Sequence, residues 1–150
     1  LVALFRALAS FSCFEVKLTT MEGTVIEGEK LLVSIGNGVR TGGAFYLTPD
    51  AYPDDGLIDA CIIGPMGRLR ILRLLPRSFK GDHVGSPEIT MLRTASLTVE
   101  SPRPYPMHVD GEFVESAAGR RVITVRPRAL AVLCKDHQPE ALTQALEKMF

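Results

Sequence analysis

Two short segments of the sequence combine glycine with acidic residues in patterns that could support chemistry. The first begins at Asn37-Gly38, continues with Gly42-Gly43 and ends in Asp54-Asp55-Gly56, directly before an apolar run. Glycine lets the backbone take a positive φ or approach another group closely, and a carboxylate at a turn suits a hard cation. The second, Asp110-Gly111-Glu112, ends an alternating strand, where a carboxylate could accept a proton. We therefore expect the chemistry of this chain in these two segments.

Both segments also have a purely structural interpretation. Asp-Gly between two strands is a strong hairpin signal, so Asp110-Gly111 could be only a turn. The glycines at 38, 42 and 43 could serve a tight connection that needs a positive φ, and Asp54-Asp55-Gly56 could be a solvated, capping loop. Arg40, in the same glycine-rich segment, could meet a phosphate or lie in solvent.

Apolar residues recur in short segments that predict β-strands around these sites. Phe14–Thr20 alternates, and Thr24–Gly28 is its expected return strand after a turn at Glu22-Gly23. Lys30–Ile35 and Leu57–Ile63 are apolar throughout, which predicts buried strands, the first of them central in its sheet. Further strands are expected at Glu88–Leu92, Ser96–Glu100, Tyr105–Asp110, Arg121–Val125 and Ala129–Cys134. Short strands between Pro, Gly and charged turns favour a mainly β (α+β) sandwich over a βαβ sheet.

The segment Met66–Lys80 has a helical period and predicts a helical insertion between the strands. Its leucines recur every three or four residues, Pro76 is expected to kink or split it, and Gly81 is a suitable cap. Basic residues follow the same spacing and form a stripe beside the apolar one: Arg70, Arg73, Arg77 and Lys80. Such a stripe is typical of a solvated surface helix, and it could also dock on anionic lipid headgroups.

Composition indicates one folded domain of moderate size and excludes several classes of protein. The 150 residues are 46% hydrophobic and 23% charged, enough for one core, so residues 1–150 form one domain or one compact half of a larger enzyme. Formal net charge is zero, so no global field favours nucleic acid, and we expect no nucleic-acid partner. No apolar stretch approaches the roughly 20 residues of a membrane span, so we expect a soluble or at most peripheral domain.

The cysteines, histidines and termini add three expectations. Cys13, Cys61 and Cys134 are far apart, which predicts free, buried thiols in a reducing compartment. His83 and His137 have no partner at ligand spacing, so we expect no zinc site. The first nine residues lack a starting Met and a cleavage site, which indicates a helix in a fragment and not a signal peptide. A further helix is expected over Pro139–Phe150.

Taken in order, these motifs resemble the C-terminal half of bacterial diacylglycerol-kinase-type lipid kinases, in the superfamily of sphingosine kinases and NAD kinases. The elements are the glycine segment from Asn37, Pro49-Asp50-Ala51, the Asp54–Asp59 stretch, the basic helix and Val109–Glu112. The resemblance extends from Leu1 to about Cys134 and depends on several elements in the right order, each weak alone.

The resemblance implies a two-domain enzyme of which only the second domain is present here. Such kinases join an N-terminal nucleotide-binding α/β domain to a C-terminal β-sandwich. The Gly-Gly-Asp-Gly-Thr motif with which the family holds phosphates does not occur in this sequence, nor does a Gly-x-x-x-x-Gly-Lys-Ser/Thr loop. We therefore expect ATP to be held by the missing domain, and this chain alone to be inactive.

The resemblance also implies a role for each candidate residue. Asp110 would be the general base, assisted by Glu112. Mg²⁺ would be held by the Asp55 carboxylate and the carbonyls of Tyr52 and Leu57, together with groups of the missing domain. The residues expected to line the cleft near the ATP phosphates are Asn37, Gly38, Gly42 and Gly43.

The expected function is phosphate transfer from ATP to the hydroxyl of a diacylglycerol-like lipid. The alternatives are a kinase for another lipid alcohol, such as a sphingoid base or phosphatidylglycerol, and a β-sandwich binding or regulatory module without catalysis. The expected partners are the lipid alcohol, the missing domain and an anionic membrane surface, and the resemblance leaves room for a homodimer. The expected location is cytoplasmic, peripheral at the inner membrane face.

Overall fold

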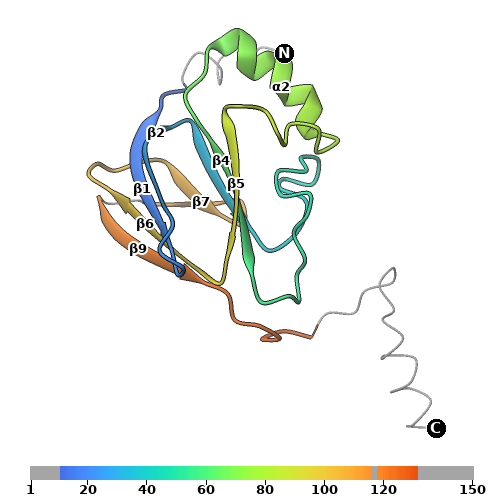
Figure 1. The fold of residues 1–150 in the computed structure, drawn as a ribbon, viewed down its shortest axis with the longest axis vertical. Coiled ribbons are helices and arrows are strands. Elements are labelled where there is room, and N and C mark those ends of the chain that lie inside the picture. The colour runs from blue at the N-terminus through green and yellow to red at the C-terminus, as the bar shows by residue number, and fades with distance from the viewer. Residues whose placement is uncertain (1–10, 116–117, 132–150) are drawn as a thin grey trace, which may run out of the picture.

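The computed structural model describes residues 11–115 and 118–131, which form a mainly β structure with one helix (Figure 1). This confirms the expected fold class. The elements in chain order are β1 Phe14–Thr20, β2 Val25–Lys30, β3 Leu32–Gly36, β4 Ile58–Ile63, α2 Arg68–Ser78, β5 Ile89–Thr94, β6 Ser96–Ser101, β7 Met107–Val109, β8 Glu112–Val114 and β9 Gly119–Thr124.

The larger sheet is antiparallel and has the order β2-β1-β6-β9. Strands β1 and β2 form the predicted hairpin, whose turn includes Gly23 at φ +88°. Along β1, Val16, Leu18 and Thr20 are buried while the residues between them are more exposed, as the alternating sequence predicts. This sheet therefore has one face on the core and one face toward solvent.

The smaller sheet is also antiparallel and has the order β3-β4-β5. Strand β4 is its centre and is almost entirely buried, which confirms the prediction for Leu57–Ile63. Lys30–Ile35 was expected to be a central strand, and this is wrong: among the described strands β3 pairs with β4 alone, and it is half-buried. An apolar run does not distinguish a central strand from an edge strand that packs on a core.

The two sheets pack face to face around one hydrophobic core. Its buried members come from both sheets: Val16, Leu18, Ile58, Ala60, Ile62, Leu97 and Val99. Residues from opposite sheets in one cluster are the arrangement of a β-sandwich. The expected sandwich is therefore the observed fold.

The outer face of β4 is buried as well, because loops cover it. Asp59 and Cys61, which alternate with the core residues, are 5% and 0% exposed. His83, from the loop after α2, is buried against Cys61, and Arg93 of β5 lies beside Asp59. The loops before β4 and after α2 therefore form a third, irregular layer over the smaller sheet.

Helix α2 lies at one end of the sandwich (Figure 1). It starts two residues later and ends two residues earlier than expected, and Pro76 lies inside it without splitting it. Pro76 is in the last turn, so the hydrogen bond that it cannot donate is lost only near the helix end. Gly81, at φ +78°, then reverses the chain, and the Asp82 N–H donates to the Arg77 carbonyl at 3.0 Å.

The C-terminal strands differ from prediction in three places. Tyr105–Asp110 contributes only the short β7, because Pro104 and Pro106 cannot donate to a ladder. Strand β8 was not predicted, and it pairs with β7 in a two-stranded hairpin. Ala129–Cys134 was expected to be a strand, but 129–131 are not, since Arg128 at φ +55° turns the chain there.

Several expectations concern residues that the structure does not describe. Cys134, His137 and the helices expected at the two ends of the chain lie outside 11–115 and 118–131. Among the residues described, no helix is long and apolar enough to cross a bilayer.

Candidate functional site

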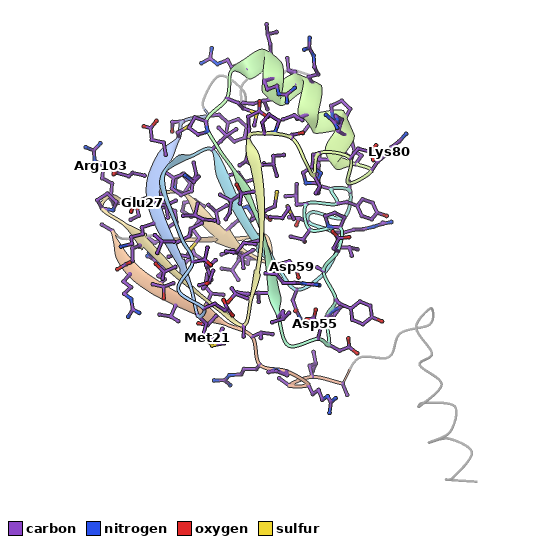
Figure 2. All side chains as sticks on the ribbon, viewed as in Figure 1. Met21, Glu27, Asp55, Asp59, Lys80 and Arg103 are labelled. Atoms are coloured by element: carbon purple, nitrogen blue, oxygen red, sulfur yellow. The ribbon has the colours of Figure 1, made fainter. Side chains whose placement is uncertain are left out.

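The acidic loop, residues 50–56, is held against the smaller sheet by Arg93. The guanidinium lies 3.1 Å from Asp55 Oδ2 and 3.2 Å from Asp59 Oδ1, and it donates to the Asp50 carbonyl at 2.7 Å. Asp59 and Arg93 are directly opposite each other in the β4–β5 pair. Figure 2 shows Asp55 and Asp59 near each other beside this sheet. The candidate metal ligand Asp55 therefore shares one cation with Asp59.

Asp59 is the most buried charged group of this cluster. Burial raises the pKa of Asp59 above its ordinary value, while the positive charge of Arg93 acts in the opposite direction. Its Oδ2 is buried and accepts no hydrogen bond from the described residues. An open depression of about 190 Å³ adjoins it, lined by Asp50, Asp59, Met91, Leu92 and Arg93.

Both oxygens of the Asp55 carboxylate have a partner that fixes their position. Oδ1 accepts a hydrogen bond from the Leu57 N–H at 2.8 Å, and Oδ2 faces Arg93. Gly56 between them has φ +77°, and the Asp55 N–H points to the Tyr52 carbonyl at 3.4 Å. The structure thus brings Asp55, Tyr52 and Leu57, the three expected metal-binding residues, into one turn.

The donors of this turn fit a hard cation in type but not in number. A carboxylate and carbonyl oxygens are what Mg²⁺ prefers, and it needs about six ligands. No group of three or more His, Cys, Asp or Glu side chains is arranged to hold a metal ion in the described ranges. Any cation here would need further ligands, from water or from another part of the protein.

The glycine loop, residues 37–44, is a compact turn beside the acidic loop. Thr41 and Phe45 exchange backbone hydrogen bonds of 2.8 and 3.1 Å, and Gly42 and Gly43 between them have φ +58° and +76°. The structural requirement for glycine therefore holds at these two positions. Arg40 stacks on the Tyr46 ring and also donates to its hydroxyl, so it does not extend freely into solvent.

Asn37 and Gly38 connect the glycine loop to its surroundings. The Asn37 side-chain amide donates to the Pro53 carbonyl at 3.1 Å, and the Thr48 hydroxyl donates to the Gly38 carbonyl at 2.8 Å. Gly38 has no positive φ, and a Cβ there would meet nothing within 4 Å among the described atoms. Nothing in the described fold therefore requires glycine at position 38.

Asp110 and Glu112 lie at the tip of the β7–β8 hairpin. Asp110 at φ +49° and Gly111 at φ +90° form a two-residue turn, so Asp110 is in the turn itself and not on the strand as predicted. Glu112 begins β8 opposite Val109, and both acids are exposed. No hydrogen bond or ion pair joins them to the acidic or glycine loop within the part of the chain that the structure describes.

Cys61 and His83 form a buried pair that does not resemble a nucleophilic dyad. The Cys61 sulfur lies 3.7 Å from His83 Nε2, which is also 3.3 Å from the Leu47 carbonyl. Burial raises the pKa of the Cys61 thiol to about 11 and lowers the pKa of His83. Both groups are therefore neutral at neutral pH, whereas a reactive cysteine needs a depressed pKa. Cys61 is a buried thiol as expected, and Cys13 is partly exposed.

The basic stripe of α2 is not uniform in the structure. Arg70 makes a bidentate pair with Glu88, at 2.9 and 3.0 Å, which lowers the pKa of Glu88. Arg73, Arg77 and Lys80 are exposed, and so are Leu69 and Phe79, at 81% and 44%. Arg70 therefore does not belong to an exposed basic stripe as its spacing predicted. The exposed cations are Arg73, Arg77 and Lys80, and the apolar side chains of Leu69 and Phe79 are exposed as well.

A hollow larger than the depression at Asp59 lies away from these loops. It measures about 660 Å³ and lies on the outer face of the larger sheet, where charged side chains of alternating sign face solvent. Lys17 there is paired in register with Glu27 and Glu100, and Glu100 with Arg120. This open, charged surface lacks the apolar, enclosed character of a ligand pocket.

The sequence pattern did not predict a role for Arg93, whose guanidinium binds both the acidic loop and β4. Its position was the only available signal: it lies near the end of β5, opposite Asp59 of β4, on the outer face of the smaller sheet. That face is covered only in the folded chain, so spacing alone did not reveal the pairing.

Comparisons with known proteins agree with this fold. A family model described as YegS C-terminal NAD kinase beta sandwich-like domain matches residues 1–134. A diacylglycerol kinase from Mycobacterium tuberculosis is 33% identical over 118 residues, which cover 78% of this chain and 37% of the relative. A diacylglycerol kinase from Staphylococcus carnosus is 28% identical over 92 residues, covering 61% of this chain and 30% of the relative.

Solved structures show the same architecture. A diacylglycerol kinase from Bacillus anthracis superposes with a TM-score of 0.54 at 24% identity, covering 79% of this chain and 43% of the other. The chain thus spans less than half the length of these relatives. The expected family is confirmed by the match over residues 1–134, and the chain belongs to the family of YegS C-terminal NAD kinase beta sandwich-like domains.

Proposed function

We propose that this chain is the C-terminal, lipid-substrate half of an ATP-dependent kinase that phosphorylates the hydroxyl of a diacylglycerol-like lipid. The observation that carries the proposal is the family match, because residues 1–134 include every candidate site residue. The relatives named diacylglycerol kinase are about three times as long as the matched region, which leaves room for a nucleotide-binding domain before it.

In this proposal Asp110 accepts the proton of the lipid hydroxyl. Transfer of a γ-phosphoryl group needs an attacking oxygen that is held in line and relieved of its proton. A carboxylate in a turn at the tip of a hairpin is accessible to a substrate that binds between two domains. Glu112, two residues further on at the start of β8, would assist Asp110 in this role.

The nucleotide and the metal have expected places on the two loops. The ATP phosphates would lie near Asn37, Gly38, Gly42 and Gly43, and the N-terminal domain would supply most of the nucleotide contacts. The described fold does not require glycine at position 38, so close approach of a phosphate would explain it. Asp55 and the carbonyls of Tyr52 and Leu57 would hold Mg²⁺, which would supply positive charge between the domains. The anionic membrane surface would meet α2 from the cytoplasmic side.

Lipid phosphorylation by the two-domain kinase tests the proposal. Radioactive ATP is offered with mixed micelles of diacylglycerol, a sphingoid base or phosphatidylglycerol, and the labelled lipids are separated. Labelled phosphatidic acid from the two-domain protein, with none from this chain alone, supports the proposal. Label in another lipid alcohol points to the alternative kinases, and no labelled lipid with an intact fold points to a binding module.

A further inference from the structure

Arg93 connects three separate points of the chain around the acidic loop. Its guanidinium reaches the Asp50 carbonyl, the Asp55 carboxylate and the Asp59 carboxylate, at 2.7, 3.1 and 3.2 Å. Asp50 and Asp55 are near the two ends of the loop, and Asp59 is on β4. The planar fork of arginine can bind several acceptors at fixed angles, which a lysine ammonium cannot do.

The backbone that carries Arg93 is held firmly in the smaller sheet. Its strand, β5, is paired along its whole length with the buried strand β4. The neighbouring Leu92 packs against the hydrophobic core. The guanidinium therefore connects the acidic loop to a strand whose position is fixed by the sheet.

The connection continues to the glycine loop. Asn37 donates to the carbonyl of Pro53, which is inside the acidic loop, and so a displacement of residues 50–56 would also release Asn37. The acidic loop, which carries the candidate metal ligands, is thus bound to β5 by Arg93. The glycine loop, which carries the candidate phosphate residues, is bound in turn to the acidic loop by the Asn37–Pro53 hydrogen bond.

Removal of the Arg93 guanidinium would leave the buried Asp59 carboxylate without its cation. The Asp59 side chain is 8% exposed, and among the described residues Arg93 is the one cation within ion-pair distance of it. Removal of one partner of a buried pair leaves an uncompensated charge. Asp55 would at the same time lose the contact that fixes Oδ2.

We propose that Arg93 is a positioning residue, whose fork holds the Asp55 carboxylate and the Asp50 carbonyl against the β4–β5 sheet and thereby orders both candidate loops. It acts through these loops and need not contact substrate. The part of this inference that concerns catalysis rests on the proposed function, whereas the part that concerns loop order does not.

Hydrogen exchange tests the loop order in the chain as it is. Arg93→Lys keeps the charge and removes the fork, and exchange of a peptide covering residues 49–57 should become at least about tenfold faster. Arg93→Met combined with Asp59→Asn removes the guanidinium together with the buried charge, so the protein can fold, and it should show the same acceleration. Arg120→Lys, an exposed arginine on β9, is the control and should exchange like the wild type. Wild-type exchange in either Arg93 variant would overturn the proposal.

Steady-state kinetics of the two-domain kinase test the catalytic part. Arg93→Lys should lower kcat by about tenfold or more with little change in KM for ATP, and it should raise the Mg²⁺ concentration needed for half-maximal activity. Arg120→Lys should change neither. Accelerated exchange with unchanged kcat would overturn the positioning role. An inactive wild-type kinase would instead count against the proposed function, and the exchange result would stand.

Discussion

Asp110 occupies a backbone conformation that few residues tolerate. At φ +49° it is in the left-handed region, where Asn and Asp are much more common than other residues that have a Cβ. The hairpin interpretation of Asp110-Gly111 is therefore confirmed as geometry. It does not compete with a catalytic role, because a turn at the tip of a hairpin also presents the carboxylate to a substrate.

The first prediction concerns Asp110→Asn in the proposed two-domain kinase. Asn accepts the same φ, so the melting temperature should hardly change, while loss of the base should lower kcat by about 10²–10⁴-fold. KM for ATP should stay nearly constant if nucleotide is held by the other domain. Steady-state kinetics on the folded variant measure this. Asp82→Asn, another exposed acid in a turn, serves as the control, and a kcat within a few-fold of wild type for Asp110→Asn would place the base elsewhere.

The second prediction concerns the buried His83. Burial lowers its pKa in the folded state, so below the unfolded value, near 6.5, the unfolded chain binds a proton that the folded chain does not. Stability should therefore be complete above about pH 7 and decrease as the pH falls toward 5, by on the order of 1 kcal/mol. In His83→Gln this decrease should be smaller. Urea unfolding at several pH values measures it, and equal pH dependence of the two proteins would show that other groups titrate.

At the scale of single elements, helix α2 has two distinct faces. On one face Leu74 and Ser78 are buried, and Arg70 pairs with Glu88. The other face presents Leu69, Arg73 and Arg77, and Lys80 follows just after the helix end. The helix contains no acidic residue. Exposed cations accompanied by apolar side chains are typical of a helix that lies on a membrane surface.

The third prediction follows from this asymmetry. Replacement of Arg73, Arg77 and Lys80 by Gln should weaken sedimentation with anionic vesicles, more at low salt than at high salt, since each cation near the surface contributes about 1 kcal/mol. Arg70→Gln is the matched control, because Glu88 already neutralises Arg70, and it should bind vesicles nearly as the wild type does. Unchanged binding by the triple variant would show that the exposed face is only solvated.

At the scale of the whole molecule, the candidate site residues are on two separate parts of the sandwich. The glycine and acidic loops lie beside the smaller sheet, and Asp110 and Glu112 are on the β7–β8 hairpin. Arg93 and Asn37 join the loops, whereas no described hydrogen bond or ion pair brings Asp110 to Asp55. In the proposed two-domain kinase, substrate, nucleotide and metal would complete this incomplete arrangement. The whole enzyme, and not the sandwich by itself, is then the unit of catalysis.

The fourth prediction tests whether Asp55 holds a cation between the domains. In the two-domain kinase, Mg²⁺ should raise the melting temperature of the wild type, as expected when a ligand at about 100 times its Kd adds about 2.7 kcal/mol. Asp55→Asn should abolish this increase. It should also lower the melting temperature slightly in EDTA, because the pair with Arg93 is lost. Asp54→Asn is the control, and an undiminished Mg²⁺ effect in Asp55→Asn would exclude Asp55 as a ligand.

Local sequence by itself determined most of the strands, the α2 helix and the glycine and acidic turns. Alternation in β1, the apolar run of β4 and the helical leucine spacing are each properties of a few consecutive residues, so they could be predicted. The order of the motifs was also sufficient to predict the family, which the match over residues 1–134 confirms.

Tertiary structure alone decided which charges meet and which strands are at an edge. Arg93 is far from Asp50 and Asp55 in sequence, and the three come together only because β4 and β5 pair and a loop covers their outer face. For the same reason the sequence did not show that Arg70 pairs with Glu88 instead of facing solvent with the other cations. Nor did it show that β3, although apolar, lies at an edge of its sheet among the described strands. Residue types and spacing specify what each segment can form locally, whereas the partners of a charge or a strand depend on the packing of distant segments, which a single sequence does not display.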